Sequence, residues 1–375
     1  MKELVDRAAQ RLAELTPWDA EPMTAVGDLA GRPLVVSDPG RWPSLVACGE
    51  HICRFFGGSL ERSDAIISND PFVGAWHVTD FTLLFRGERG TAFARMRLPD
   101  IGGFELGGLA PQSFDTWGEG ARFPALRVAA GGAPRREGLD LVALNSRTPN
   151  LVRHGLAVME QVAAELADAI DGGPAIGAES LRQAAEVAAG ALAALTPGTY
   201  HAQAAVQSPL PGEPPVVRVQ LTLDSGRCRL SLAGSDPQLE APVNSPPQHT
   251  RDVCLAGLAD VVPGFPLAPG ALDAVELDPG AGTVAGAGAP AITGQARYHT
   301  ARAIRQALNA VLHQAGAPLP DGDDGWWQAA GRADYERWVD SATGRLRKKT
   351  VDDLRALEAR AALPAGHDQT ESGMT

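Results

Sequence analysis

Two adjacent segments of strictly alternating polarity constrain the fold of this chain more than any other feature. Residues 216–223 (VVRVQLTL) place Val217, Val219, Leu221 and Leu223 on one face and polar side chains on the other. This alternation is typical of a strand with one buried face. Asp224-Ser225-Gly226 forms a turn signal, and RCRLSLAG then alternates again. The pattern predicts a β-hairpin covered on one side.

Helical patterns alternate with further strand patterns along the chain. Helices are predicted at residues 1–16, 44–56, 151–172, 178–195 and from Thr300, which we expect to cap the last of them. Strands are predicted at 24–36, as a hairpin-like pair, and at 77–85 and 90–98, joined through Gly87-Glu88-Arg89-Gly90. The sequence therefore predicts an α+β fold with mixed sheets in two or more lobes and a central helical pair.

These patterns divide the chain into four parts. We expect a strand-rich N-terminal lobe at 1–150, the helical pair at 151–196, a second α/β lobe at 197–320, and a Trp-containing helical appendage with a flexible tail at 321–375. Trp326, Trp327 and Trp338 of the appendage either form an interface with another subunit or close the core.

Composition excludes several classes of function. A formal net charge of −12 argues against binding to nucleic acid or an anionic membrane. No apolar run is long enough to span a bilayer, and the N-terminal segment has no secretory pattern. The four cysteines are scattered and match no standard zinc spacing, which favours free thiols in a reducing cytoplasm. We expect a cytoplasmic protein that handles a small molecule or another subunit.

The segment SNDPFVGAWHVTD carries the first candidate site. His77 and Asp80 lie three residues apart behind a loop rich in Pro and Gly, and Asp100-Ile101-Gly102-Gly103 follows the partner strand. Paired strands should bring these positions together. A histidine and a carboxylate can hold a divalent cation or orient a water, although an ordinary hydrogen-bonded pair is the alternative.

These motifs resemble one known family. The stretches NDPFVGAWHVTDFTLL, RLPDIGG, GEGARFPALRV and LNSRTPN, with AGSDPQLEAPVNSPPQHT further on, resemble the hydantoinase B/oxoprolinase family. That family supplies one subunit or half of ATP-dependent hydantoinases, 5-oxoprolinases, and acetone and acetophenone carboxylases. The resemblance implies a hydantoinase B-like fold and a small-molecule substrate. It also implies an oligomeric assembly in which a hydantoinase A-like ATPase subunit handles ATP, since the chain has no nucleotide-binding motif.

The resemblance also implies one divalent metal ion, Zn or Mn, at His77 and Asp80. Family members add a histidine from a His-His-x-Asp-Ile-Gly-Gly motif, but here Arg97-Leu98-Pro99 precede Asp100. An arginine offers no lone pair to a metal. A further ligand would have to come from Asp100, Glu119, His51 or His154. Otherwise His77 and Asp80 form a hydrogen-bonded pair, and Arg97 pairs with Asp80 or Asp100.

Three residues are candidates for catalysis. Asp100 and Glu119 match family positions and would be site carboxylates, although Glu119 could instead pair with a loop arginine such as Arg122. Arg147, in NSRTP, either clamps a substrate carboxylate or ties its loop to the next helix. Asn69 and Asp70 are expected to form a structural turn.

The departures leave two functions open. His154-Gly155 stand where the family has Gly-Asp, and the chain starts later and stops earlier than we expect of family members. One hypothesis is a subunit of an ATP-dependent amidohydrolase of hydantoinase or oxoprolinase type, or of a carboxylase. The other is a non-catalytic scaffold or regulatory homologue with a degenerate metal site.

Overall fold

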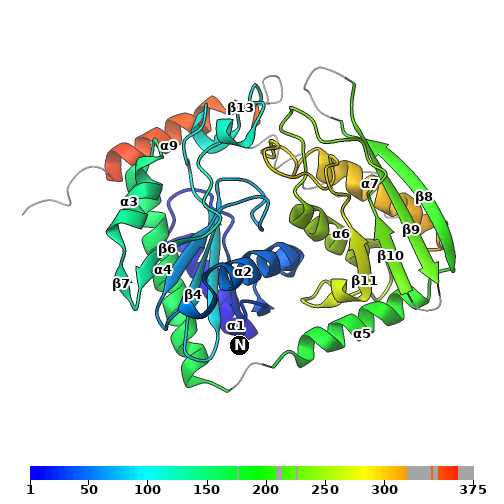
Figure 1. Cartoon of the computed structure of the whole chain (residues 1–375), viewed down its shortest axis with the longest axis horizontal. Coiled ribbons are helices and arrows are strands. Elements are labelled where there is room, and N and C mark those ends of the chain that lie inside the picture. The colour runs from blue at the N-terminus through cyan, green and yellow to red at the C-terminus, as the bar shows by residue number, and fades with distance from the viewer. Residues whose placement is uncertain (175–176, 208–212, 225–226, 319–338, 341–344, 362–375) are drawn as a thin grey trace, which may run out of the picture.

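The computed structural model describes residues 1–174, 177–207, 213–224, 227–318, 339–340 and 345–361, which form two lobes side by side (Figure 1). The helices are α1 (Lys2–Glu14), α2 (Trp42–Phe56), α3 (Arg136–Leu144), α4 (Pro149–Gly172), α5 (Glu179–Ala193), α6 (Pro247–Val261), α7 (Thr300–Gln314) and α9 (Lys348–Ala361). The strands are β1 (Met23–Gly27), β2 (Pro33–Val36), β3 (Ala65–Ser68), β4 (Asp80–Arg86), β5 (Thr91–Arg97), β6 (Leu126–Ala130), β7 (Ala133–Pro134), β8 (Gly198–Ala205), β9 (Val216–Asp224), β10 (Arg227–Ser231), β11 (Val275–Asp278), β12 (Val339–Asp340) and β13 (Arg345–Leu346).

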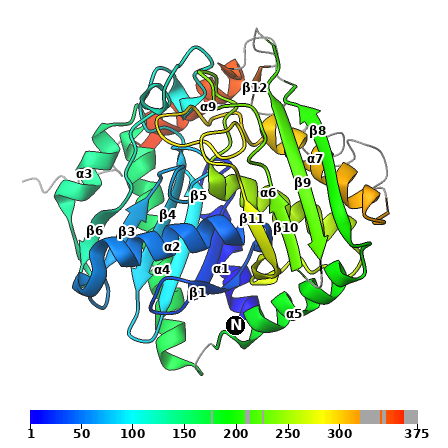
Figure 2. The same ribbon diagram turned by 45° about the vertical axis from the view of Figure 1, so that its right-hand side comes forward.

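The first lobe is built on an antiparallel sheet. Among the described residues its strands follow the order β2-β1-β5-β4-β3-β6-β7, and each neighbouring pair is antiparallel. Helices α1 and α4 cover one face and α2 covers the other (Figure 2). On β4, Phe81, Leu83 and Phe85 face the α1/α4 core, whereas Leu84 faces the α2 core. Because both faces are covered, β4 reads as a nearly continuous apolar run.

The second lobe is built on a smaller sheet. Its described strands follow the order β11-β10-β9-β8, with β10 and β11 parallel and the other pairs antiparallel. Helix α7 packs on β8 and β9, and α6 packs on α7 (Figure 1). The buried positions of β9 alternate along the strand, which confirms the one-sided hairpin predicted from the sequence. The turn residues Ser225 and Gly226 lie outside the described residues.

A buried carboxylate links the two lobes. Helix α2 contacts α6, and Asp252 of α6 accepts hydrogen bonds from the Ser44 backbone N–H at 2.9 Å and from Trp76 Nε1 at 2.6 Å. Asp252 is 2% exposed. Burial raises the pKa of this carboxyl to about 7, against the opposing effect of its two donors. The hydrogen bond to Asp252 therefore holds the Trp76 side chain of the first lobe against α6 of the second lobe.

Three expectations need correction. The helices expected as a pair are present, but α4 packs on the first sheet and α5 packs on β10 of the second lobe, because their apolar faces find different sheets. His299, and not Thr300, is the N-cap of α7, and the Thr300 hydroxyl donates to the Val243 carbonyl. The sequence patterns predict no strand at 275–278, but the structure has β11 there, paired with β10. Trp326, Trp327 and Trp338 lie outside the described residues.

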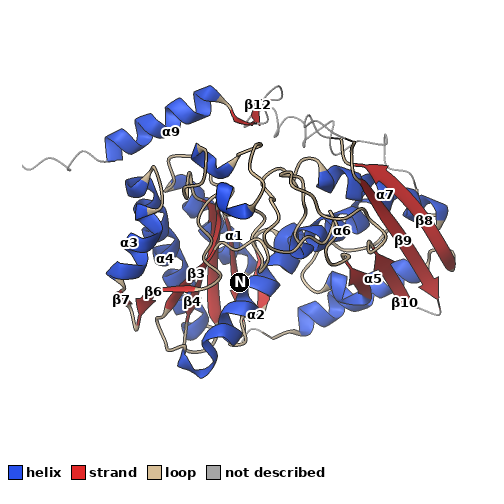
Figure 3. Cartoon of the chain, turned by 45° about the horizontal axis from the view of Figure 1, so that its top comes forward, coloured by secondary structure: helices blue, strands red, loops and turns tan. Residues whose placement is uncertain are grey.

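Among the described helices none is long and apolar enough to cross a membrane. The charged helix expected near the C-terminus is α9, which lies along the outside of the first lobe, over α4 (Figure 3).

Candidate functional site

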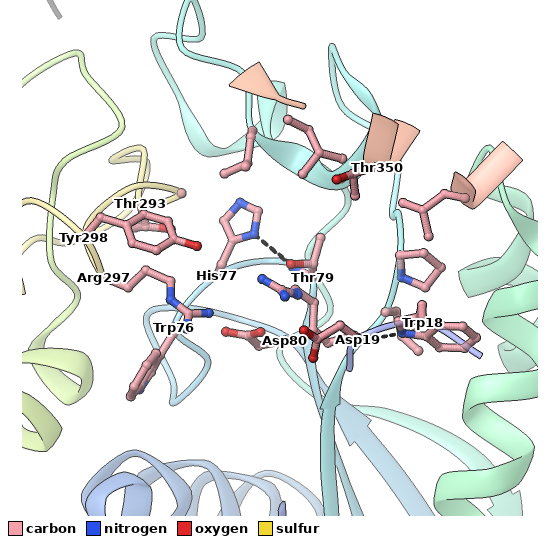
Figure 4. A pocket seen from close by; sticks show the side chains of 18 residues that line it. Trp18, Asp19, Trp76, His77, Thr79, Asp80, Thr293, Arg297, Tyr298 and Thr350 are labelled. Carbon is pink, nitrogen blue, oxygen red and sulfur yellow. Dashed lines mark hydrogen bonds between the residues drawn. The ribbon is translucent and has the colours of Figure 1, made fainter. Parts of the chain in front are cut away.

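A pocket opens where the two lobes meet α9 (Figure 4). Its cavity volume is about 60 Å³, which is room for about two water molecules. Trp76, His77, Thr79, Asp80 and Arg97 come from the first lobe, Thr293, Gly294, Arg297 and Tyr298 come from the second, and Leu346, Thr350 and Leu354 come from the C-terminal segment. The site motif of the sequence therefore does line a pocket, but only together with residues more than 200 positions further along the chain.

His77 lies at the centre of this pocket, in the loop before β4. Its Nδ1 lies 2.9 Å from Thr79 Oγ1, and the Thr79 backbone N–H donates to the same nitrogen at 3.5 Å. An Nδ1 that accepts a backbone N–H carries no proton, so the neutral ring is assigned its proton on Nε2. The ring is held between Gly108 and Gly294, where an added Cβ would lie 2.5 Å from His77 Cε1 and 3.2 Å from His77 Nε2, respectively. The His77 ring therefore fits here only because residues 108 and 294 are both glycine.

Glu119 lies directly behind His77. Its Oε1 is 3.7 Å from His77 Nε2 and accepts the Gly294 backbone N–H at 2.6 Å, while Oε2 accepts the Thr293 N–H at 3.0 Å and the Thr293 hydroxyl at 3.3 Å. The carboxyl has no exposed surface. Glu119 therefore joins the histidine of the first lobe to a loop of the second. Of the candidate site residues His77, Asp80, Asp100, Glu119 and Arg147, His77 and Asp80 line the pocket, and Glu119 lies next to His77.

Burial makes the uncharged form of both partners more favourable. It raises the pKa of Glu119 to about 8, although the donors of Thr293 and Gly294 act in the opposite direction. It lowers the pKa of His77 to about 3, and the charge of Arg97 lowers it further. Near neutral pH the imidazole is therefore uncharged, and its Nδ1 lone pair accepts the Thr79 N–H.

The raised pKa of Glu119 predicts a pH dependence of stability. The unfolded chain releases this proton near pH 4.5 and the folded chain holds it until about pH 8, so the stabilisation is lost as the pH rises through this window. Relative to Glu119→Gln, the free energy of unfolding of the wild type should fall by up to about 1.4 kcal/mol per pH unit between these values. Urea unfolding of both proteins at pH 5–8 measures the difference. A rise in the difference with pH would show that the folded protein favours the carboxylate.

Arg97, Arg297 and Asp80 line the pocket floor, and both arginines pair with Glu21, which lies outside the lining. Glu21 Oε1 pairs with Arg97 Nη2 at 3.0 Å and Glu21 Oε2 pairs with Arg297 Nη1 at 2.9 Å. Burial alone would raise the pKa of Glu21, but the charges of Arg297 and Arg97 outweigh it and lower the pKa to about 2. Asp80 lies opposite Arg97 across β4 and β5, and Arg297 extends toward it in Figure 4. Arg97 thus pairs with a carboxylate as expected, although the ion pair in the structure is with Glu21.

The donor set does not fit a resident divalent cation. Within the part of the chain that the structure describes, no three His, Cys, Asp or Glu side chains are grouped so that they could share an ion. Burial raises the pKa of Asp80, although the fixed charges of Arg297 and Arg97 beside it act in the opposite direction. His51 stacks on Phe55, and His154 Nε2 contacts the Leu15 carbonyl at 2.8 Å, so neither supplies the missing ligand.

Asp100 and Arg147 pair with each other away from the pocket lining. Asp100 is fully buried and accepts the Arg147 backbone N–H at 2.6 Å, and its Oδ1 lies 3.2 Å from Arg147 Nη1. Arg147 also donates to the carbonyls of Gly102 and Gly103. In this geometry Arg147 ties its loop to the loop at Asp100–Gly103, whereas the structural alternative from the sequence tied it to the next helix. The catalytic roles assigned to the pair from the sequence remain predictions.

Several pocket residues had no signal in the sequence. Trp76 and Arg297 line the pocket from unrelated segments, and Glu21, which pairs with Arg297, comes from a third. The Arg297 guanidinium lies 5.5 Å from the centre of the Trp76 ring, and the indole N–H donates to Asp252. Asn69, expected in a turn, is buried and bridges two segments: its amide donates to the Val78 and Ala121 carbonyls and its Oδ1 accepts the Phe123 N–H.

Comparisons with known proteins place this chain. It is 28% identical over 109 residues to caprolactamase subunit beta of Pseudomonas jessenii, which covers 28% of this chain and 19% of the relative. It is 30% identical over 95 residues to an uncharacterized protein of Methanocaldococcus jannaschii, covering 24% of this chain and 17% of the relative. The matched segments thus span less than a fifth of either relative.

Solved structures show the same fold. The ATP-dependent caprolactamase of Pseudomonas jessenii superposes with a TM-score of 0.71 at 20% identity, covering 84% of this chain and 59% of that one. The nucleotide-free acetone carboxylase superposes with a TM-score of 0.70 at 16% identity, covering 84% and 46%. This chain therefore spans about half the length of these structures. The Hydantoinase B/oxoprolinase family matches residues 25–336, which is most of the chain, and the protein belongs to this family.

Proposed function

We propose that this chain is the hydantoinase B-like subunit of an ATP-dependent complex that hydrolyses a small cyclic amide or carboxylates a small carbonyl compound. The observation that carries the proposal is the buried His77–Glu119 pair behind a pocket with two arginines. A titratable pair with pKa values shifted by burial, placed in a cleft, is typical of a catalytic site. The relation to a caprolactamase subunit and to an acetone carboxylase supports the reaction class.

The residues suggest a division of roles. His77 lines the pocket and is neutral with its proton on Nε2, so it can donate a hydrogen bond from Nε2 to a ligand carbonyl oxygen without carrying a charge. Thr79 sets the tautomer of the ring, and Glu119 holds the loop of residues 293 and 294 beside it, so both act as positioning residues. Arg97 and Arg297 supply positive charge to the pocket floor, where it would stabilise negative charge that develops on a carbonyl oxygen.

The proposed partner supplies the activation that this chain lacks. An amide carbonyl is a poor electrophile, and transfer of a phosphoryl group to its oxygen by a hydantoinase A-like ATPase subunit would make the ring carbon susceptible to water. The Zn or Mn ion implied by the family resemblance has no complete donor set among the described residues, so the proposed chemistry involves no metal.

A second candidate function is a non-catalytic scaffold. It is favoured by the ion-pair network of Glu21, Arg97 and Arg297, which puts fixed charge on the pocket floor where a catalytic ion would be expected. Such a chain would keep the fold and an interface with its partner but lack turnover.

Reconstitution distinguishes the two functions. The protein is purified without chelator, analysed for Zn and Mn, and mixed with a hydantoinase A-like subunit from the same source. ATP hydrolysis and product formation are then measured with hydantoin, 5-oxoproline, caprolactam, and acetone with bicarbonate. Turnover that is lost in His77→Ala supports the enzyme. A stable complex without turnover of any compound supports the scaffold, and failure to bind the partner would refute both.

A further inference from the structure

The C-terminal strap, defined here as residues 345–361, forms one wall of the pocket. It comprises β13 and α9, and it places Leu346, Thr350 and Leu354 against the cavity that His77 lines (Figures 3 and 4). Leu346 packs on the backbone of Gly107, whose added Cβ would lie 3.1 Å from Leu346 Cδ2. Leu354 is 7% exposed although α9 is otherwise a charged surface helix. The apolar side of the strap thus faces the pocket.

A carboxylate holds the strap in place. Helix α4 begins at Pro149 without a side-chain cap from Thr148, so its first backbone N–H groups lack partners within the helix. Glu358 of α9 supplies them: Oε1 accepts the Asn150 N–H at 3.0 Å and its side-chain amide at 2.8 Å, and Oε2 accepts the Leu151 N–H at 3.0 Å. A negative charge at this position also suits the dipole of α4. At the other end of the strap, Arg345 pairs with Glu105 at 3.0 Å.

The strap lies beyond the residues that match the family. The family match ends at residue 336, and the strap begins at residue 345. The catalytic candidates therefore lie in the shared part of the fold, whereas one wall of their pocket lies outside it. We propose that the strap is the specificity-determining wall of this pocket, and that Glu358 is the latch whose release opens the pocket to its ligand.

The wall has a defined chemistry. Asp80, Arg97 and Arg297 make one side of the pocket polar and charged, while Leu109, Leu346 and Leu354 make the strap side apolar. A ligand that satisfies both sides is amphipathic, with an amide or carbonyl group toward the arginines and a hydrocarbon part toward the strap. This assignment of ligand class rests on the proposed function, whereas the role of the strap in access does not.

Access is tested on the full chain without any substrate. Diethyl pyrocarbonate modifies neutral imidazoles, and mass spectrometry resolves each modified histidine, so His77 reports on the pocket and exposed His201 serves as the internal standard. In Glu358→Ala, amide hydrogen exchange in residues 348–361 and modification of His77 should both rise, roughly two- to thirtyfold for the loss of a cap. Modification of His201 should not change. Asp352→Asn, which alters an exposed carboxylate on the same helix, should match the wild type.

Three results would overturn the proposal. Unchanged exchange in the strap of Glu358→Ala would show that Glu358 is not a latch. Faster exchange of the strap without faster modification of His77 would show that the strap does not control access. An equal rise in exchange across β4 and β5 would mean general unfolding. Leu354→Ala provides a second test, because it should speed modification of His77 while the Asn150 and Leu151 amides stay protected.

Ligand preference is tested separately in the reconstituted complex. Leu354→Ala enlarges the apolar side, so kcat/KM should shift several-fold in favour of lactams that carry larger hydrocarbon substituents. An unchanged preference would refute the role in specificity. If the wild type turns over no compound, the proposed function fails, and modification of His77 still decides the role of the strap.

Discussion

Replacing Glu119 with glutamine is expected to lower kcat of the reconstituted complex by roughly 10²–10⁴-fold. Both carboxyl oxygens accept backbone N–H groups from residues 293 and 294, so the amide of a glutamine would oppose one of these donors with its own N–H. The loop would move relative to His77, and the imidazole would lose the group that faces Nε2. The change should fall mainly on kcat, since Glu119 does not line the pocket.

The matched control is Glu137→Gln, which alters a carboxylate on α3 whose side chain is 74% exposed. It should retain wild-type turnover. The pH dependence of kcat separates this role from a purely structural defect. If ionisation of Glu119 limits kcat in the wild type, that step in the pH profile should be absent in Glu119→Gln. Wild-type kcat in Glu119→Gln would remove Glu119 from the proposed site.

Phe93→Ala is expected to destabilise the protein by about 3–5 kcal/mol. Phe93 lies on β5 with no exposed surface, and its ring fills the space between the sheet and α2. The fit is close, since a Cβ added at Gly49 of α2 would lie 2.9 Å from Phe93 Cε1. Truncation to alanine would leave a cavity that the flanking backbone cannot close.

Urea unfolding, followed by circular dichroism, measures this loss. Phe114→Ala is the control, because Phe114 is 63% exposed and its removal should change the free energy of unfolding by no more than about 0.5 kcal/mol. Similar losses in the two variants would contradict the described packing of α2 on the sheet.

The strands and long helices were predictable because their polarity patterns are local. The β4–β5 and β9–β10 pairs were expected at nearly their observed places, as were α1, α2 and α4. Helix α6 was not, since it is buried on several sides and carries Thr250 and Asp252 among its buried residues, so no single apolar face marks it. Strand β11 was missed because only four residues pair within a region rich in Gly and Pro.

The site was predictable only in its first half. The motif around His77 predicted one wall of the pocket. The backbone N–H donors to Glu119 lie 174 and 175 residues further along the chain, and no local sequence pattern indicates such donors. Arg97 was expected to pair with Asp80 or Asp100, yet Glu21, 76 positions earlier, forms its ion pair. Such contacts are set by how the lobes dock, which single-segment patterns do not encode.

The buried carboxylate of Asp252 joins the two lobes next to the pocket. It receives one hydrogen bond from α2 and one from the Trp76 indole N–H, while Arg297 lies over the ring of that indole. Neither lobe alone contains all the residues that line the pocket, so the pocket exists only while the two lobes stay joined. Separation of the lobes would therefore take the pocket apart even if each sheet stayed folded, so the junction between the lobes is what holds the pocket together.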